Sequence, residues 1–409
     1  MDRLAIDFGT SNSAAAVFAG GAVRRLPIEA GAETLPTAVF FPEGGGAMRI
    51  GAAAGAALIG GEEGRYMRAL KSVLGLPLFH EKRLIEGRRR TLAEVVTAFL
   101  VQLRERSEGF TGMRFARALS GRPVHFHGDA EKDAQAEADL RGCYLAAGFE
   151  EVTFLPEPEA AAVACQGMGR SEGMGLIVDI GGGTSDFTLF RSGAEVEILA
   201  SHGLRLGGTD FDRVVSLAEV MPLLGLGGEL RREFGPGLLP VPAAIFVDLA
   251  TWQKIPFLYA PDVRREVAGM VKLAVEPARL GRLARVLEDE LGHALAFAVE
   301  KGKIAANDAG LGRIGMGMVE PGLAAELTAA RMDAVLGEAR AALGAAAREL
   351  LARAGVAPEA VGRVILVGGS SLMGFVEAEM RTVCGGAEVL RSEAFTAVVD
   401  GLAMAAAAR

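Results

Sequence analysis

Two stretches of this chain repeat one pattern of residues, about one small domain apart. Residues 4–18 read LAIDFGTSNSAAAVF and residues 176–190 read LIVDIGGGTSDFTLF. Each is an apolar run that ends in aspartate, then a turn of glycine, threonine and serine, then a second apolar run, which is the pattern of a β-hairpin. This duplication predicts two like halves that face each other, each offering a carboxylate and a ring of free backbone N–H groups.

The remaining elements repeat in the same order. Residues 1–60 read as a strand meander, followed by a helix over 91–106, a strand over 117–125, a helix over 130–147, a strand over 152–155 and a helix that opens at Pro158. The second half has strands over about 176–202, helical segments, a strand over 364–367 and a further helix. A mixed sheet covered by helices is therefore expected in each half. Thr91 and Glu94 have the spacing of a capping box, and the basic run 88–90 before them is expected at an exposed hairpin tip.

Composition narrows the class of protein. The chain has 409 residues, of which 50% are hydrophobic and 23% charged, which allows two or three domains. Its formal net charge of −8 argues against a general nucleic-acid or anionic-membrane binder, and no apolar run is long enough for a membrane span. Cys143, Cys165 and Cys384 are far apart, without a CxxC pair or a signal peptide. A reducing, cytoplasmic setting is expected.

The hairpin turns carry the chemistry. Asp7 and Asp179 each stand where an apolar strand meets glycine, and a buried carboxylate is costly there unless it is paired or bound to a cation. The turns at 9–13 and 181–185 would let successive N–H groups cradle phosphates. Mg²⁺ takes few carboxylates together with water and phosphate oxygens, so the two matched turns favour a triphosphate and its metal. The chain holds no GxxxxGK[ST] sequence, which excludes a P-loop.

A third signal, VILVGGSSLMG at 364–374, is a buried strand ending in paired glycines that could pack against a nucleoside. Six motifs then follow one another along the chain: DFGTSNS, LPEPEAAA, VDIGGGTSD, LGGTDFD, EKGKIAAN and LVGGSS. Together they resemble the nucleotide-binding domain of the seventy-kilodalton heat-shock chaperones, the DnaK superfamily. The resemblance covers essentially the whole chain. It looks closest to short members that consist of the ATPase module alone, without a peptide-binding domain.

The resemblance implies an α/β, actin-like ATPase fold, in which two ribonuclease-H-like lobes flank a nucleotide cleft. It implies lobe I over residues 1–170, closed by a C-terminal helix over 391–409. Lobe II would cover residues 171–390, with a helical, Gly/Pro-rich subdomain at about 217–310.

The resemblance also implies roles for the residues at matching positions. Those implied at the metal are Asp7, Asp179 (through water) and Asp186. Those implied in catalysis are Lys71 at the γ-phosphate, Glu157 beside the attacking water, Asp179 and Thr184. Those implied to hold the nucleotide are Gly9, Thr10, Ser11, Asn12, Gly181, Gly182, Gly183, Gly207, Gly208, Glu300, Lys303, Asn307, Gly368, Gly369 and Ser370. A fixed cation such as Lys71 would stabilise the charge that develops during phosphoryl transfer.

Two positions depart from the family pattern. Ile304 and Leu372 stand where the family places two arginines that sandwich adenine. An arginine stacked on a ring is worth roughly 0.5–2 kcal/mol. Loss of both stacks would therefore weaken nucleotide binding by roughly one to two orders of magnitude, unless the aliphatic side chains clamp the base by apolar packing.

The implied function is that of an ATPase that binds ATP and ADP with Mg²⁺, hydrolyses ATP slowly and closes its lobes as the nucleotide changes. It would act in protein quality control through co-chaperones or client-binding proteins. The alternative is a non-catalytic, nucleotide-responsive scaffold or a filament-forming actin-like protein. A sugar kinase of the same fold ranks lower, because Lys71 and the Glu157-Pro158 motif fit the chaperone branch better.

Three other features are interpreted as structural. His125 and His127 alternate along an expected strand and share a face, but no third ligand is evident nearby, so no metal site is expected there. Residues 221–242, rich in glycine and proline, are either a connector between helices or a partner-binding segment. Trp252 is expected in the core.

Overall fold

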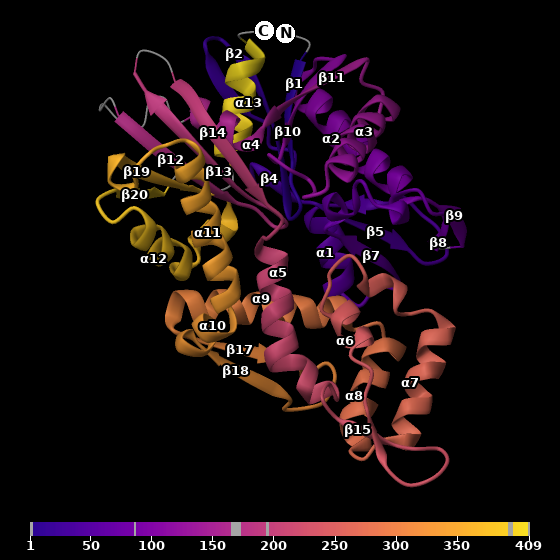
Figure 1. The fold of residues 1–409 in the computed structure, drawn as a ribbon. Coiled ribbons are helices and arrows are strands. Elements are labelled where there is room, and N and C mark those ends of the chain that lie inside the picture. The colour runs from indigo at the N-terminus through magenta and orange to yellow at the C-terminus, as the bar shows by residue number, and fades with distance from the viewer. Residues whose placement is uncertain (1–2, 86, 165–172, 194–195, 392–395, 408–409) are drawn as a thin grey trace. The chain divides into compact units, whose positions relative to one another are not determined.

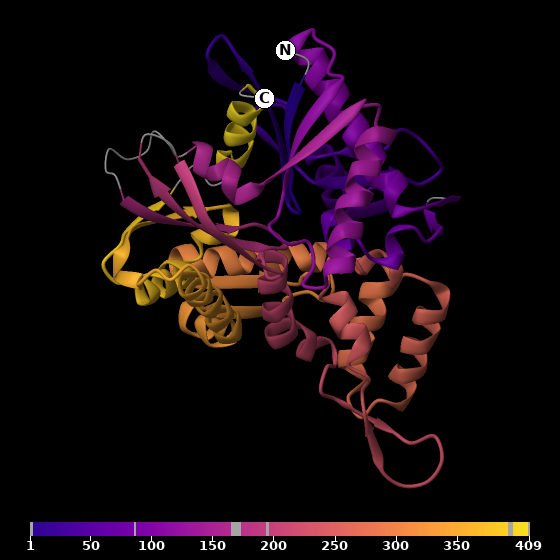
Figure 2. The ribbon, with the colours of Figure 1, turned by 45° about the horizontal axis from the view of Figure 1, so that its top comes forward.

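The structure is a computed structural model of the chain, and it describes residues 3–85, 87–164, 173–193, 196–391 and 396–407. The chain divides into two compact units, and each is described by itself. Unit 1 comprises residues 1–208 and 340–409, and unit 2 comprises residues 209–339. Figures 1 and 2 show the ribbon in two views. No helix in the described ranges is both long enough and apolar enough to cross a membrane.

The first sheet of unit 1 has the strand order β11-β10-β1-β2-β3, and β4 also pairs with β2. Its strands are β1 (Arg3–Phe8), β2 (Asn12–Ala19), β3 (Ala22–Arg25), β4 (Thr34–Pro36), β10 (Arg117–Arg122) and β11 (Glu151–Pro156). The strands β1, β10 and β11 run parallel, whereas β1, β2 and β3 form an antiparallel meander. The predicted first hairpin is therefore β1–β2.

The second sheet of unit 1 repeats this topology, with the order β14-β13-β12-β19-β20. Its strands are β12 (Gly173–Ile180), β13 (Ser185–Ser192), β14 (Val196–Leu204), β19 (Val361–Val367) and β20 (Glu388–Arg391). Here β12, β13 and β14 are antiparallel, and β12, β19 and β20 are parallel. Apart from β4, the two sheets thus correspond strand by strand, which confirms the two like halves of the α/β fold that the duplicated hairpins predict.

Two short helices occupy equivalent places after the last parallel strand of each sheet. They are α4 (Glu157–Ala164) after β11 and α13 (Ala397–Ala407) after β20, and they pack against each other. Both are rich in alanine, so their backbones come close: a Cβ on Gly401 would overlap the carbonyl of Ala160. Around them lies a core to which both sheets contribute, including Ala5, Ile177 and Ile365. Helix α13 (yellow) lies beside β1 and β2 (indigo) in both views (Figures 1 and 2).

The other elements of unit 1 surround the sheets. They are β5 (Ala38–Pro42), β6 (Arg49–Ile50), α1 (Ala52–Ile59), β7 (Gly64–Arg68), η1 (Leu70–Val73), η2 (Pro77–Phe79), β8 (Arg83–Ile85), β9 (Arg88–Arg90), α2 (Leu92–Thr111), α3 (Ala130–Ala146), η7 (Pro358–Ala360), η8 (Gly369–Leu372) and α12 (Gly374–Val383), with α11 (Gly337–Arg353) entering from unit 2. The predicted capping box is confirmed, because Thr91 Oγ1 accepts the Glu94 N–H and the Glu94 carboxylate accepts the Thr91 N–H.

Four sequence predictions in this unit need correction. Residues 52–59 are helical rather than part of a strand meander, because five of these eight residues are alanine, the best helix former. The run Arg88–Arg90 is itself the exposed second strand of a hairpin rather than its tip. Helix α2 continues to Thr111 and ends at Gly112, which takes a left-handed conformation. Strand β10 ends at Arg122, just before Pro123, instead of continuing to His125.

Unit 2 is mostly helical. Its elements are α5 (Gly208–Val215), η4 (Ser216–Val220), η5 (Met221–Leu224), β15 (Glu229–Arg231), β16 (Leu238–Pro240), α6 (Ala244–Leu249), η6 (Ile255–Phe257), α7 (Pro261–Leu273), α8 (Pro277–Glu288), α9 (Gly292–Ala309), β17 (Leu311–Gly315), β18 (Ala324–Thr328) and α10 (Ala329–Val335). Trp252 is buried, as predicted, and its indole N–H donates to Asp212. The segment 221–242 forms a 3₁₀ turn and the β15–β16 hairpin, with Phe234 exposed between the strands.

Candidate functional site

The ends of the central strands of both sheets in unit 1 meet at one small cavity. It is lined by Asp7, Gly9, Thr10, Ser11, Asn12, Lys71, Glu157, Asp179, Gly181, Gly182, Thr184, Val367, Gly368, Gly369, Ser370 and Val398. The cavity measures about 110 Å³, whereas pockets for whole small-molecule ligands are roughly 300–1,000 Å³. Its size suits phosphate groups and a cation rather than a complete nucleotide.

A buried ion pair lines the cavity. Lys71 Nζ lies 2.5 Å from Glu157 Oε1, and both residues are buried. Glu157 begins α4, where Pro158 at the second position costs no hydrogen bond. Lys71 is the second residue of the 3₁₀ turn η1. Ala69, the residue before this turn, has a φ of 59°, which is unusual for a residue with a side chain. Burial opposes the charge on Lys71, but Glu157, Asp7 and Asp186 outweigh it and raise its pKa.

Three aspartates crowd the same region. Asp179 and Asp186 face each other across the β12–β13 hairpin, and Asp7 ends the apolar run of β1. Burial, reinforced by the charge of Glu157, raises the pKa of Asp7 to about 7 and that of Asp186 to about 8. Burial and the neighbouring carboxylates raise the pKa of Asp179 well above its usual value. Without a bound cation, the carboxyl groups therefore favour their protonated forms, because Lys71 is the cation that lines this cavity.

This donor set fits a hydrated Mg²⁺. An excess of buried carboxylates is costly in the protein alone, and a divalent cation would offset it. Within the described ranges, no group of three or more acidic, histidine or cysteine side chains is close enough to form a metal cage by itself. Mg²⁺ is usually held by one or two carboxylates, with water and phosphate oxygens completing its shell. Asp7, Asp179 and Asp186 would hold it, directly or through water.

Backbone geometry makes glycine necessary at three points around the cavity. A Cβ on Gly9 would overlap the carbonyl oxygen of Asn12 within the first turn. A Cβ on Gly207 would lie 2.6 Å from the Gly183 nitrogen, where the loop after β14 crosses the second turn. Gly368 has φ of +82°, and a Cβ there would lie 2.6 Å from Asp179 Oδ1. The loop at Gly207 is thus packed against the second turn, and Gly368 is packed against the Asp179 carboxylate.

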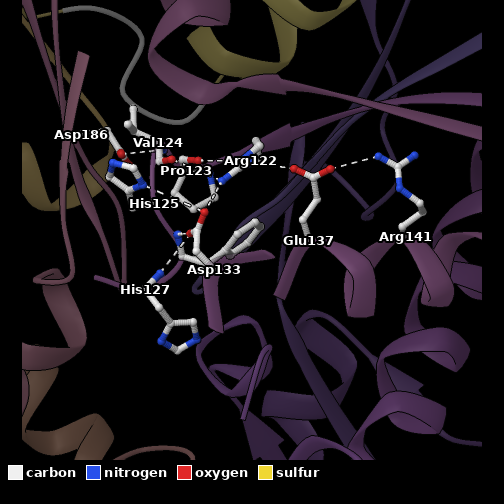
Figure 3. Close-up of polar contacts among 10 residues, drawn as sticks. Arg122, Pro123, Val124, His125, His127, Asp133, Glu137, Arg141 and Asp186 are labelled. Carbon is white, nitrogen blue, oxygen red and sulfur yellow. Dashed lines mark hydrogen bonds and ion pairs between the residues drawn. The ribbon is translucent and has the colours of Figure 1, made fainter. Parts of the chain in front are cut away.

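Most of the residues predicted for phosphates, metal and catalysis are brought together. Asp186 and Gly183 adjoin the cavity without lining it: Asp186 Oδ1 accepts the Val124 N–H at 2.7 Å (Figure 3). Gly207 and Gly208 follow β14, and the Gly208 N–H donates to the Gly181 carbonyl at 3.0 Å. Sequence reasoning missed Val367 and Val398. Valine carries no chemical signal for a site: Val367 lines the cavity as the last residue of β19, and Val398 does so because α13 packs beside the strand ends.

The residues predicted to hold ribose and base lie in unit 2. Glu300, Lys303 and Asn307 fall on one helix, α9, as their spacing predicts. Lys303 is buried and pairs with Asp212 at 2.6 Å within that unit. Ile304 on the same helix is 47% exposed, whereas Leu372 belongs to η8 of unit 1. Their roles at a base remain predictions.

The two histidines do not lie on a strand as the sequence suggested. Both follow Arg122 in the loop before α3, because Pro123 cannot donate to a sheet ladder. His127 is buried, and both of its ring nitrogens have protein partners. His125 is the more exposed of the two, with Nδ1 4.0 Å from Asp133. Of the cysteines, Cys143 and Cys384 are buried free thiols, and Cys165 lies outside the described residues.

Comparison with known proteins adds an independent observation. Residues 80–219 match the family model described as Hsp70 protein. Two similar proteins, each called chaperone protein DnaK, come from Endomicrobium trichonymphae and Methanothermobacter thermautotrophicus. Each is 32% identical to this chain, over 224 and 219 residues respectively. The matches cover 52% of this chain but only 34% and 35% of the two relatives, so the chain spans about a third of their length.

Proposed function

We propose that this chain binds Mg-ATP in this cavity and hydrolyses it slowly. Its similarity to the Hsp70 family model and to DnaK chaperones over about half of the chain, and its actin-like ATPase fold, support the proposal. One observation carries the proposal. Both duplicated hairpin turns, the strand-end glycines of β19 and the Lys71–Glu157 pair line a single cavity sized for phosphates. A two-sided backbone cradle with excess buried carboxylate suits a ligand that brings its own divalent cation.

In this proposal each group has a distinct task. The N–H groups and hydroxyls of the two turns bind the phosphate oxygens, and Lys71 neutralises charge that develops at the γ-phosphate. Glu157 and Asp179 orient water for in-line attack. Bound Mg²⁺ would supply further charge neutralisation on the phosphates. The nucleotide also draws the two lobes together, and release of phosphate relaxes them.

Binding of the base is expected to be weak. Glu300, Lys303 and Asn307 would hold the ribose and base, with Gly368, Gly369 and Ser370 against the nucleoside. Because Ile304 and Leu372 replace the stacking arginines of the family, the affinity for ATP should fall by roughly one to two orders of magnitude relative to an arginine clamp.

The test is single-turnover hydrolysis of γ-labelled ATP with Mg²⁺, comparing wild type with Asp179→Asn. The proposal predicts release of phosphate by the wild type and loss of more than about 100-fold in the variant. Glu379→Gln is the control, since Glu379 is also a buried carboxylate but pairs with Arg340 away from the cavity. Equal rates for wild type and Asp179→Asn would show that the site is misassigned.

Hydrolysis would serve protein quality control through partners, such as co-chaperones or client-binding proteins, in a reducing, cytoplasmic compartment. The second candidate is a nucleotide-responsive scaffold or an actin-like filament, which the altered positions Ile304 and Leu372 favour. Calorimetry with ATP, ADP and GTP separates these possibilities, because tight binding without hydrolysis indicates a scaffold. Light scattering that rises with protein concentration in ATP indicates a filament.

A further inference from the structure

The loop between β10 and α3 places one buried histidine against the segment that carries Lys71. The loop is fixed from two sides: Asp133 Oδ1 accepts the N–H groups of Phe126 and His127, and Asp186 accepts that of Val124 (Figure 3). The residue His127 is only 7% exposed. Its Nε2 lies 2.6 Å from the carbonyl oxygen of Leu74, three residues after Lys71.

The other ring nitrogen of His127 meets a residue from the second sheet. Nδ1 lies 2.6 Å from Nη1 of Arg205, which follows β14. The other terminal nitrogen of the same guanidinium, Nη2, donates to the carbonyl oxygen of Ser72 at 2.8 Å. Arg205 and His127 together therefore bind the two carbonyls, of Ser72 and Leu74, that follow Lys71 in the chain.

These partners define the protonation state of the imidazole. A carbonyl oxygen can only accept, so Nε2 carries the hydrogen in the bond to Leu74. A guanidinium can only donate and stays charged, so Nδ1 must offer its lone pair to Arg205. His127 is therefore neutral, in the Nε2–H tautomer. A second proton on Nδ1 would meet the Arg205 cation at hydrogen-bond distance and break that contact.

The segment held in this way is tightly built. Gly75 takes φ of +74°, and its N–H donates to the buried Asp139 at 2.9 Å. A Cβ on Gly75 would lie 3.1 Å from His127 Nε2, so the chain passes directly against the imidazole. Lys71 itself needs correct placement, because small displacements of a catalytic group lower rates steeply.

We propose that His127 and Arg205, called the latch below, hold the carbonyls of Ser72 and Leu74 and so position Lys71 for phosphoryl transfer. Protonation of His127 breaks its contact with Arg205 and releases this segment. The role in transfer rests on the proposed ATPase function. The latch also joins the two sheets, since Arg205 leads into Leu206, whose carbonyl accepts the Ser185 hydroxyl, and into Gly208, bonded to the second phosphate turn. His127 and Arg205 are thus positioning residues for both sides of the cavity.

The charges around His127 set the direction of its pH response. Arg205 faces Nδ1 from the second sheet, while Lys132 and Asp133 face the ring from α3, and Asp139 lies beyond Gly75. Burial, together with Arg205 and Lys132, lowers the pKa of His127 below its ordinary value, although Leu74 and Asp133 oppose the shift. The folded protein thus binds this proton less readily than the unfolded chain. The stability that the latch contributes is present above about pH 6.5 and is lost as the pH falls.

Imidazole NMR of the nucleotide-free protein tests the latch without any turnover. The wild type should show His127 as the neutral Nε2–H tautomer at pH 7.5, titrating below pH 6.5, and Arg205→Ala should raise that pKa. An Nδ1–H tautomer, or a His127 cation at pH 7.5, would overturn the latch.

Hydrogen exchange of the backbone amides of residues 72–76, corrected for intrinsic rates, measures how strongly His127 and Arg205 hold the segment after Lys71. His127→Gln is the informative variant, because its amide can donate to Leu74 and accept from Arg205 but does not titrate. From pH 7.5 to 5.5 the wild type should lose protection roughly tenfold, and His127→Gln should not. The exposed neighbour is the control: His125→Gln should behave as the wild type. An equal loss in wild type and His127→Gln would contradict the proposal.

The role in transfer is read from single-turnover rates over the same pH range. From pH 7.5 to 5.5 the rate of the wild type should fall roughly 10- to 100-fold relative to that of His127→Gln. Arg205→Ala should hydrolyse ATP slowly at every pH. If the rates of the wild type and His127→Gln fall equally at low pH, His127 does not position Lys71. An inactive wild type would instead refute the ATPase, while NMR and exchange would still decide whether the latch exists.

Discussion

At the level of single residues, the defining property of the cavity is that buried carboxyl groups outnumber the one buried lysine that lines it. Lys71 is buried with Glu157, and Asp7, Asp179 and Asp186 add further carboxylates whose pKa values are raised by burial. Burial of a charge is unfavourable without a partner, so this arrangement costs stability in the nucleotide-free protein. Cavities that keep such a cost are typical of functional sites.

Removing Lys71 should therefore destabilise the protein more than removing most surface charges. We expect Lys71→Met to lower the free energy of unfolding by roughly 3 kcal/mol, because it leaves Glu157 buried without its partner. Adding Glu157→Gln to that variant should restore much of the loss. Urea unfolding of the wild type, both single variants and the double variant, in EDTA without nucleotide, measures the coupling. Additive effects would mean that the pair seen at 2.5 Å contributes nothing.

At the level of elements, the sequence predicts most of what positions the site. The apolar runs and glycine turns correctly give both hairpins, and the strand before Gly368 is where its apolar run places it. Lys71 could not be placed from its own pattern, because a lysine next to an apolar run normally lies on an exposed face. Only the family resemblance pointed to it. His127 was misplaced because Pro123 ends β10 early, and its partners Leu74 and Arg205 are distant in sequence.

The glycine that follows β19 gives a test at this scale. Gly368→Ala should destabilise the protein by roughly 1–3 kcal/mol, because φ of +82° strains a residue with a side chain and the new Cβ would press on Asp179. Binding of Mg-ATP should weaken as well. Gly362→Ala on the same strand is the control, since its nearest neighbour is the Met174 carbonyl at 3.7 Å. Thermal unfolding and calorimetry on both variants measure their stability and their affinity for Mg-ATP. Equal stability and affinity in the two variants would show that position 368 does not require glycine.

At the level of the whole molecule, the two largest sheets in the described part of unit 1 share one topology and are joined through α4 and α13. The duplication of the hairpins predicts the like halves, and the family resemblance predicts a helix at the C-terminal end of the sequence. The close approach of the two helices could not be predicted, because alanine-rich segments give no directional signal until the Gly401 backbone meets Ala160. Val398 of α13 also lines the cavity, so this packing supports the site directly.

The packing of these two helices is sensitive to one methyl group. Gly401→Ala should destabilise the protein by roughly 1–3 kcal/mol, since α13 must move away from Ala160 to admit the Cβ. Gly109→Ala in α2 offers a helical control with open space at the Cβ, and there alanine should be neutral or stabilising. Denaturant midpoints of both variants give the comparison. A Gly401→Ala protein as stable as the wild type would contradict the observed contact.

Titration calorimetry of ATP into the nucleotide-free protein, with Mg²⁺ and then with EDTA, tests most directly whether the cavity is a metal and phosphate site. Binding should be measurable with Mg²⁺ and at least about tenfold weaker in EDTA, because Asp7, Asp179 and Asp186 would then face the phosphates without a cation. Adenosine, which lacks phosphates, should give no measurable heat. Equal affinity for ATP with and without Mg²⁺, or adenosine binding as tightly as ATP, would contradict this assignment.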